Sequence, residues 1–178
     1  SEAEKLLEEV KDLVRRLKKD LERVLRDNHR LSEELRRRLR EILEENKKLI
    51  DTLREIREKL SDRDKLEKIV EEIVRRSEET VRRIKRVVEE VEKRSKESVE
   101  DLRRRVKTVL DRLKELVDRA DGKEVAEKMR KIVEELRKEV EEVLKALKEN
   151  LDRLRREVEK VVERIEDTLR ELKKRATD

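Results

Sequence analysis

Hydrophobic residues recur along almost the whole chain at intervals of three and four residues, the spacing that places them on one face of an α-helix. The spacing breaks at two places only, residues 60–64 and 119–123, each of which contains Ser, Asp or Gly. The pattern therefore predicts an all-α protein with three long helices, at about 2–60, 63–120 and 123–176.

Both breaks contain residues that begin or end helices. Ser61 or Asp62 offers a side-chain oxygen to the first backbone N–H groups of a new helix, and Ser61 with Asp64 has capping-box spacing. Gly122, the only glycine, is suited to the left-handed conformation that ends many helices. Because such short connections force neighbouring helices to run antiparallel, we expect one up-down-up three-helix bundle over residues 1–178.

The hydrophobic stripes do not follow strict heptads. Their steps alternate between four and three residues with an occasional second four, as at Leu31, Leu35 and Leu39. In the second helix the mean step is about 3.6 residues, whereas a 3.5-residue repeat would impose a left-handed supercoil. The spacing therefore predicts a long, nearly straight, coiled-coil-like rod.

Polar residues replace hydrophobic ones at a few places in these stripes, and they do so in pairs eighteen residues apart. Eighteen residues are five helical turns, so the two members of a pair point the same way about 27 Å apart. The pairs are Asn28 with Asn46, Ser77 with Ser95, Thr80 with Ser98, and Asn150 with Thr168.

Folding the chain at its two turns brings these pairs to two common heights. With the first turn near residue 62, Asn46 lies level with about residue 78, and Asn28 with about residue 96. The third helix reaches both heights within about one turn of its own polar pair. We therefore predict two buried polar layers. The Asn28 layer contains Asn28, His29, Ser32, Ser95, Ser98 and Asn150, and the Asn46 layer contains Asn46, Ser77, Thr80 and Thr168.

We expect these layers to provide specificity rather than stability. A buried amide or hydroxyl without a partner costs about 1–3 kcal/mol, and side chains on three helices satisfy one another in one register only. The alternative is a polar pocket for an ion or a small ligand. No cluster of acids, Cys or His lies in the stripes, so we predict no metal site and no cofactor.

His29 is the only histidine, and we interpret it as a boundary residue of the Asn28 layer. A catalytic role would need a nucleophile and an orienting acid, and a metal site would need several ligands. A pH switch is a weaker alternative, because one imidazole takes up one proton. The sequence therefore predicts no catalytic residue and no enzyme.

The composition narrows the expected partners. The chain has 178 residues without Phe, Trp, Tyr, Cys or Pro, and its 54 basic and 49 acidic residues nearly cancel. Aromatic anchors for interfaces, bases and membranes are therefore missing, and basic runs such as residues 36–38 are bracketed by acids. No apolar run is long enough to span a bilayer. We expect no nucleic-acid partner and no membrane partner.

Four features occur together: a Ser1–Glu4 cap, clipped turns at 61–63 and 121–123, a core without aromatics, and two polar layers. In this combination the whole chain resembles computationally designed helical bundles with buried hydrogen-bond networks. Natural spectrin-like rods share the topology but usually keep core aromatics. The resemblance implies a stable structural scaffold with no natural substrate and no required partner. The alternative is an interaction component of a designed assembly, completed by a partner helix or by self-association.

Overall fold

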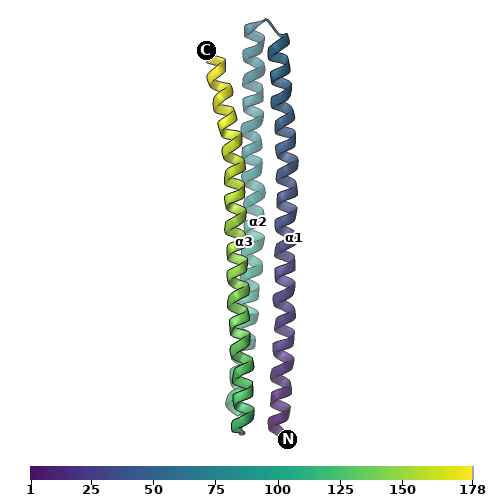
Figure 1. The fold of residues 1–178 in the computed structure, drawn as a ribbon, viewed down its shortest axis with the longest axis vertical. Helices are drawn as coiled ribbons and strands as arrows, with labels where there is room; N and C mark the ends of the chain where they lie inside the picture. The colour runs from purple at the N-terminus through teal and green to yellow at the C-terminus, as the bar shows by residue number, and fades with distance from the viewer. Residues whose placement is uncertain (178) are drawn as a thin grey trace. The chain divides into compact units, whose positions relative to one another are not determined.

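The computed structural model describes residues 1–177, with side chains for residues 1–174. Its three α-helices are α1 (Glu2–Lys59), α2 (Arg63–Arg119) and α3 (Lys123–Thr177), and no strand occurs in the described part of the chain (Figure 1). The predicted all-α, three-helix class is confirmed, and each helix boundary lies within one residue of its predicted place.

The helix starts are capped by local hydrogen bonds. Ser1 Oγ accepts from the backbone N–H of Glu4 at 3.3 Å, and Asp62 Oδ1 accepts from the N–H groups of Asp64 and Lys65 at 3.1 and 3.3 Å. These carboxylate and hydroxyl oxygens satisfy N–H groups that have no partner inside the helix. Asp62 is therefore the capping residue of α2.

Gly122 is the residue before the start of α3. It does not end α2 in a left-handed conformation, so the predicted left-handed glycine was wrong. The glycine has no positive φ angle, and its carbonyl oxygen accepts from the N–H of Ala126 at 2.9 Å, the first hydrogen bond of α3. The preceding helix ends in a tighter turn, in which the N–H of Ala120 donates to the oxygen of Val117 at 3.1 Å. Glycine is well tolerated at the residue before a helix, which explains its place here.

The described residues form two compact units, and each unit contains a segment of all three helices. Unit 1 combines Ser1–Arg30 with Lys93–Leu151, and unit 2 combines Leu31–Glu92 with the described residues from Asp152 onward. Within each unit the three segments lie side by side, and one turn joins two of them antiparallel (Figure 1). A single domain over the whole chain, and its long straight form, stay predictions.

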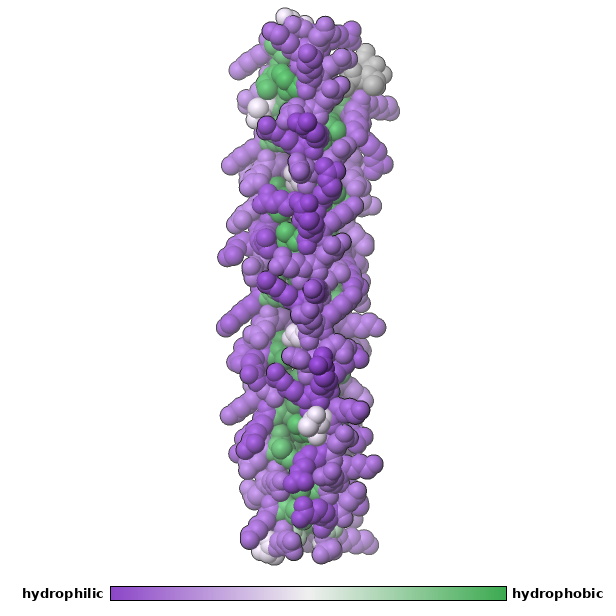
Figure 2. Space-filling view, turned by 180° about the vertical axis from the view of Figure 1, so that it is seen from behind, coloured by the Kyte–Doolittle hydropathy of each residue, from purple (hydrophilic) through white to green (hydrophobic). Residues whose placement is uncertain are grey.

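Each unit has its own aliphatic core, built from all three helices. In unit 1 the fully buried side chains include Leu17, Leu113 and Leu136, and in unit 2 they include Leu53 and Ile84. Burying one such side chain stabilises a fold by about 1.5–3 kcal/mol. Hydrophobic surface shows only as narrow strips between hydrophilic side chains on the face seen in Figure 2, and no large hydrophobic residue among the described side chains is fully exposed.

At three places along α1, two neighbouring residues could lie at the centre of the buried face. The structure buries Leu6 rather than Leu7, Ser32 rather than Leu31, and Ile50 rather than Leu49, while the alternative residue at each place is half-buried. A helix that packs against two neighbours needs a wide apolar face, and its exact centre follows from the packing angle.

The buried positions of α1 repeat every eighteen residues. They are 6, 10, 14, 17 and 21, then 24, 28, 32, 35 and 39, then 42, 46, 50 and 53. Because eighteen residues make five turns of 3.6, each copy presents the same face. Asn28 and Asn46 thus occupy the place of Val10, and in α2 Ser77 and Ser95 occupy the place of Leu113. Each polar layer therefore occupies a position of the eighteen-residue repeat that is hydrophobic in another copy of the repeat.

Candidate functional site

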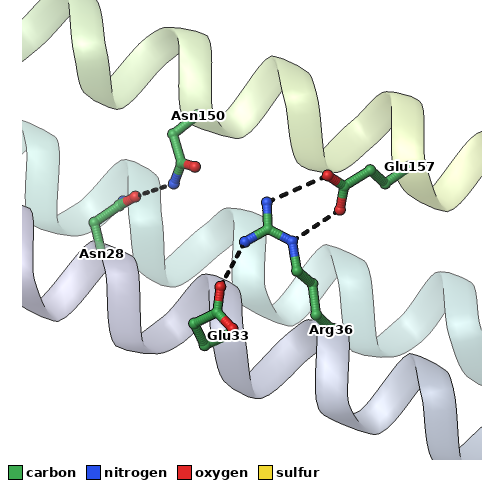
Figure 3. A network of polar contacts seen from close by, with 5 residues as sticks. All are labelled: Asn28, Glu33, Arg36, Asn150 and Glu157. Carbon is green, nitrogen blue, oxygen red and sulfur yellow. Dashed lines mark hydrogen bonds and ion pairs between the residues drawn. The ribbon is translucent and has the colours of Figure 1, made fainter.

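The Asn28 layer links all three helices of unit 1. Asn28 on α1 and Ser95 on α2 are only 8% and 4% exposed, and Asn150 on α3 is half-buried. Asn28 Nδ2 donates to Ser95 Oγ at 3.0 Å, and Asn28 Oδ1 accepts from Asn150 Nδ2 at 2.6 Å (Figure 3). One amide therefore uses its donor end toward α2 and its acceptor end toward α3.

The Asn46 layer links two helices of unit 2 by a side-chain hydrogen bond. Asn46 on α1 and Ser77 on α2 are 6% and 0% exposed, and Ser77 Oγ donates to Asn46 Oδ1 at 2.9 Å. Thr80 and Thr168 are half-buried, and their hydroxyls donate to carbonyl oxygens of their own helices at 3.0 and 2.9 Å. The hydroxyl groups of both threonines thus find their acceptors within their own helices.

The remaining predicted residues lie in different environments. Ser32 is buried and has a polar partner, Ser98 is half-buried beside a shallow hollow on α2, and His29 is exposed. No buried side-chain nitrogen or oxygen lacks a hydrogen-bond partner in the part of the chain that the structure describes. Full satisfaction of this kind is the condition under which a buried polar network fixes one arrangement.

Two arginines of unit 2 hold carboxylates on other helices, and sequence reasoning missed both. Arg36 on α1 donates to Glu157 on α3 at 2.9 and 3.3 Å and to Glu33 at 2.9 Å (Figure 3). Arg155 on α3 donates to Glu92 on α2 at 2.8 Å. A signal was available: each arginine lies beside the hydrophobic stripe, within reach of a neighbouring helix.

These contacts shift the ionisation of both guanidinium groups. Hydrogen bonds to Glu157 raise the pKa of Arg36, against the smaller opposing effect of its partial burial. The hydrogen bond to Glu92 likewise raises the pKa of Arg155, with a further Coulombic contribution from the same carboxylate. Unit 1 has a more exposed ion pair between helices, in which Arg112 on α2 donates to Glu9 on α1 at 3.0 Å. This hydrogen bond raises the pKa of Arg112. Charged contacts between helices are therefore best developed in unit 2.

The buried members of the polar layers are amides and hydroxyls, so they offer hydrogen bonds rather than proton transfer near neutral pH. Among the described residues, no group of three or more His, Cys, Asp or Glu side chains is arranged to hold a metal ion. None of the described helical segments is long and apolar enough to cross a membrane. The chemistry of this arrangement is hydrogen bonding between side chains of different helices, at the levels of Asn28 and Asn46.

Comparison with known proteins agrees with this architecture. No protein-family profile and no curated protein matches the chain. A solved structure described as a "Computationally designed three helix bundle" matches with a TM-score of 0.55 and 20% identity, covering 98% of this chain and 78% of that chain. The chain is a three-helix bundle. Its fold is similar to that of the designed protein, and the bundle contains buried side-chain hydrogen bonds between Asn and Ser.

Proposed function

We propose that this bundle is a designed scaffold whose purpose is its own fold, with no natural substrate, and that its polar layers specify how its helices pair. The observation that carries the proposal is the amide of Asn28, which bonds to Ser95 on α2 and to Asn150 on α3. A buried amide that is satisfied from two sides penalises every arrangement that removes either partner.

The eighteen-residue repeat identifies the pairing that competes. Within one chain the two short turns hold the helices in register, so the competing pairings are those between helices of two chains. A second α1 displaced by one repeat would still meet hydrophobic residues of α2, because residues such as Leu66, Ile84 and Leu102 also recur every eighteen residues. Asn28 would then face Leu113, or Val10 would face Ser95, and a buried polar group would lose its partner. The layers thus distinguish registers that the hydrophobic pattern alone treats as equal.

A component of a designed assembly is the second candidate. An uncovered partner surface usually shows as a contiguous apolar patch. The described side chains include no fully exposed large hydrophobic residue, which favours the self-contained scaffold. We propose no enzymatic role, because the buried members of both layers are amides and hydroxyls and His29 is exposed.

The test replaces the five layer residues that hydrogen-bond between helices with the residues that the repeat uses elsewhere: Asn28→Val, Asn46→Val, Ser77→Leu, Ser95→Leu and Asn150→Ile. Because both partners of each hydrogen bond are replaced, we expect an unfolding free energy equal to or above that of the parent. After refolding from denaturant, light scattering over a concentration series should give masses above one chain for this variant. The parent should stay near 21.7 kDa.

A control variant, Leu17→Ile with Leu136→Ile, changes the core of unit 1 but leaves both layers intact. We expect it to keep the parent mass. A layer-free variant that remains at the mass of one chain would refute the role in pairing, and association of the control would assign the effect to general repacking. A parent mass of two or more chains would favour the assembly component instead.

A further inference from the structure

A groove of about 550 Å³ lies between α2 and α3 of unit 1, beside the Asn28 layer. Its floor contains the buried side chains of Ser95 and Leu147, and its walls contain the half-buried side chains of Val99, Leu144 and Leu151. Ser95 stands where the next copy of the repeat has Leu113, so a smaller side chain leaves space here. The hollow is thus a consequence of building a polar layer.

The rim of this groove is basic. Lys96 and Arg103 on α2 and Lys145 and Lys148 on α3 line it with four positive charges, against one negative charge from Glu100, and a carboxylate oxygen of Glu149 lies 4.0 Å from Lys145 Nζ. The whole chain has a net charge of +5, and the lining of this groove has an excess of three positive charges. Cations around an apolar trough favour a ligand that is itself apolar along its length and anionic at one end.

We propose that this groove binds a single linear alkyl chain that has an anionic head group, such as a carboxylate or a sulfate. The volume falls in the range of about 300–1,000 Å³ typical of small-molecule sites. The chain would lie against Leu144, Leu147 and Leu151, and the head group would lie near Lys145 and Lys148. Binding would remove leucine surface from water and place the anion beside the lysines of the rim.

A second groove in the bundle provides the comparison. It lies between α1 and α3 of unit 2, has a volume of about 610 Å³, and is lined by Leu43, Ile50 and Ile165. Its charged lining consists of four basic residues and two acidic ones, so its positive excess is smaller: Arg40, Lys47, Arg54 and Arg164 against Glu44 and Asp51. A ligand held by charge complementarity should therefore prefer the groove of unit 1.

The experiment titrates the full chain with dodecanoate below its micellar concentration, by calorimetry and by NMR of the leucine methyl groups. We expect saturation at one ligand per chain, with the largest shifts at Leu144, Leu147 and Leu151. Reversing two exposed charges, Lys145→Glu with Lys148→Glu, should weaken binding about tenfold, because two attractive charges beside the head group become repulsive. Dodecyltrimethylammonium, with the same chain and a cationic head, should bind at least about tenfold more weakly.

The matched control reverses two charges on the groove of unit 2, Lys47→Glu with Arg54→Glu, and should leave the affinity within about twofold, because neither residue lines the groove of unit 1. A further variant, Leu151→Ala, keeps every charge and should weaken binding about threefold or more through lost apolar contact. Absence of saturation, several ligands per chain, equal binding of the cation, or an equal loss in the control would each overturn the proposal.

Discussion

The two units attach α3 by different means. In unit 1 the amide of Asn150 donates across the core to Asn28, whereas in unit 2 Thr168, at the corresponding place of the repeat, donates to Arg164 of its own helix. A threonine hydroxyl is one bond from Cβ and readily reaches the carbonyl four residues earlier, while an asparagine amide extends beyond its own helix. One residue type therefore decides whether a polar layer joins two helices or three.

Unit 2 compensates with charged contacts at its periphery. Arg36 bonds to Glu157, Arg155 bonds to Glu92, and Lys173 on α3 donates to Glu78 on α2 at 2.9 Å. These pairs are partly or largely exposed, so salt screens them, whereas a buried neutral amide is insensitive to salt. The comparison teaches that similar helical segments can be held by an uncharged, geometrically demanding core contact or by more permissive surface pairs.

The largest effect that tests this difference is expected from Asn28→Ala. The change removes the donor to Ser95 and the acceptor of Asn150, so it should lower the unfolding free energy by about 2–4 kcal/mol. Asn46→Ala removes only the acceptor of Ser77 and should cost about 1–3 kcal/mol. Guanidinium unfolding followed by circular dichroism measures both, and Val10→Ala measures the packing loss alone. A loss for Asn28→Ala no larger than that for Val10→Ala would contradict this account.

Converting one layer into the other is the next test. Thr168→Asn in unit 2 should extend the Asn46 layer to α3, because Thr168 and Asn46 line the same groove, and should raise stability by about 1 kcal/mol. Thr108 makes the same bond to its own helix on the exposed face of α2, so Thr108→Asn is the control and should give no gain. Equal effects at both positions in denaturant unfolding would show that no new contact between helices had formed.

A smaller effect is expected from the ion pairs of unit 2. Arg36→Gln and Arg155→Gln should each lower the unfolding free energy in urea by about 0.5 kcal/mol at low salt. In about 1 M NaCl, where charges are screened within about 3 Å, the loss should largely disappear. Arg54, whose nearest acid Asp51 is 3.8 Å away and exposed, supplies the control Arg54→Gln, for which no loss is expected. A loss that did not change with salt would point to packing rather than charge.

The smallest effect concerns Glu78. Its hydrogen bond and Coulombic attraction to Lys173 hold the pKa of this carboxyl below its usual range. Because the pKa is lower in the folded state, the resulting stabilisation is fully present above the ordinary glutamate pKa of about 4.3 and is lost as pH falls through the lowered value. Carboxyl ¹³C NMR should show an upward shift of the Glu78 titration midpoint in Lys173→Met. An unchanged midpoint would exclude Lys173 as the cause.

Prediction from the sequence worked where a local rule leaves one answer. Helix boundaries follow from capping residues and from breaks in a regular spacing, and counting from the turn placed Asn28 level with about residue 96, next to its observed partner Ser95. Spacing alone does not decide between two neighbouring residues that satisfy the same rule, such as Leu6 and Leu7, because both lie on a wide apolar face. Gly122 shows the same limit, since glycine is compatible with both the end and the start of a helix.

The sequence by itself determined the three helices, their antiparallel order through two short turns, and the heights of the polar residues. All of these follow from spacing along the chain and from the rise of a helix. Only the tertiary structure decided that Asn28 bonds on two sides, that Thr168 turns to its own helix, and that Arg36 reaches Glu157. Each of these hydrogen bonds contributes only about 1 kcal/mol to stability. The distances and angles between packed helices therefore decide which partner a side chain takes.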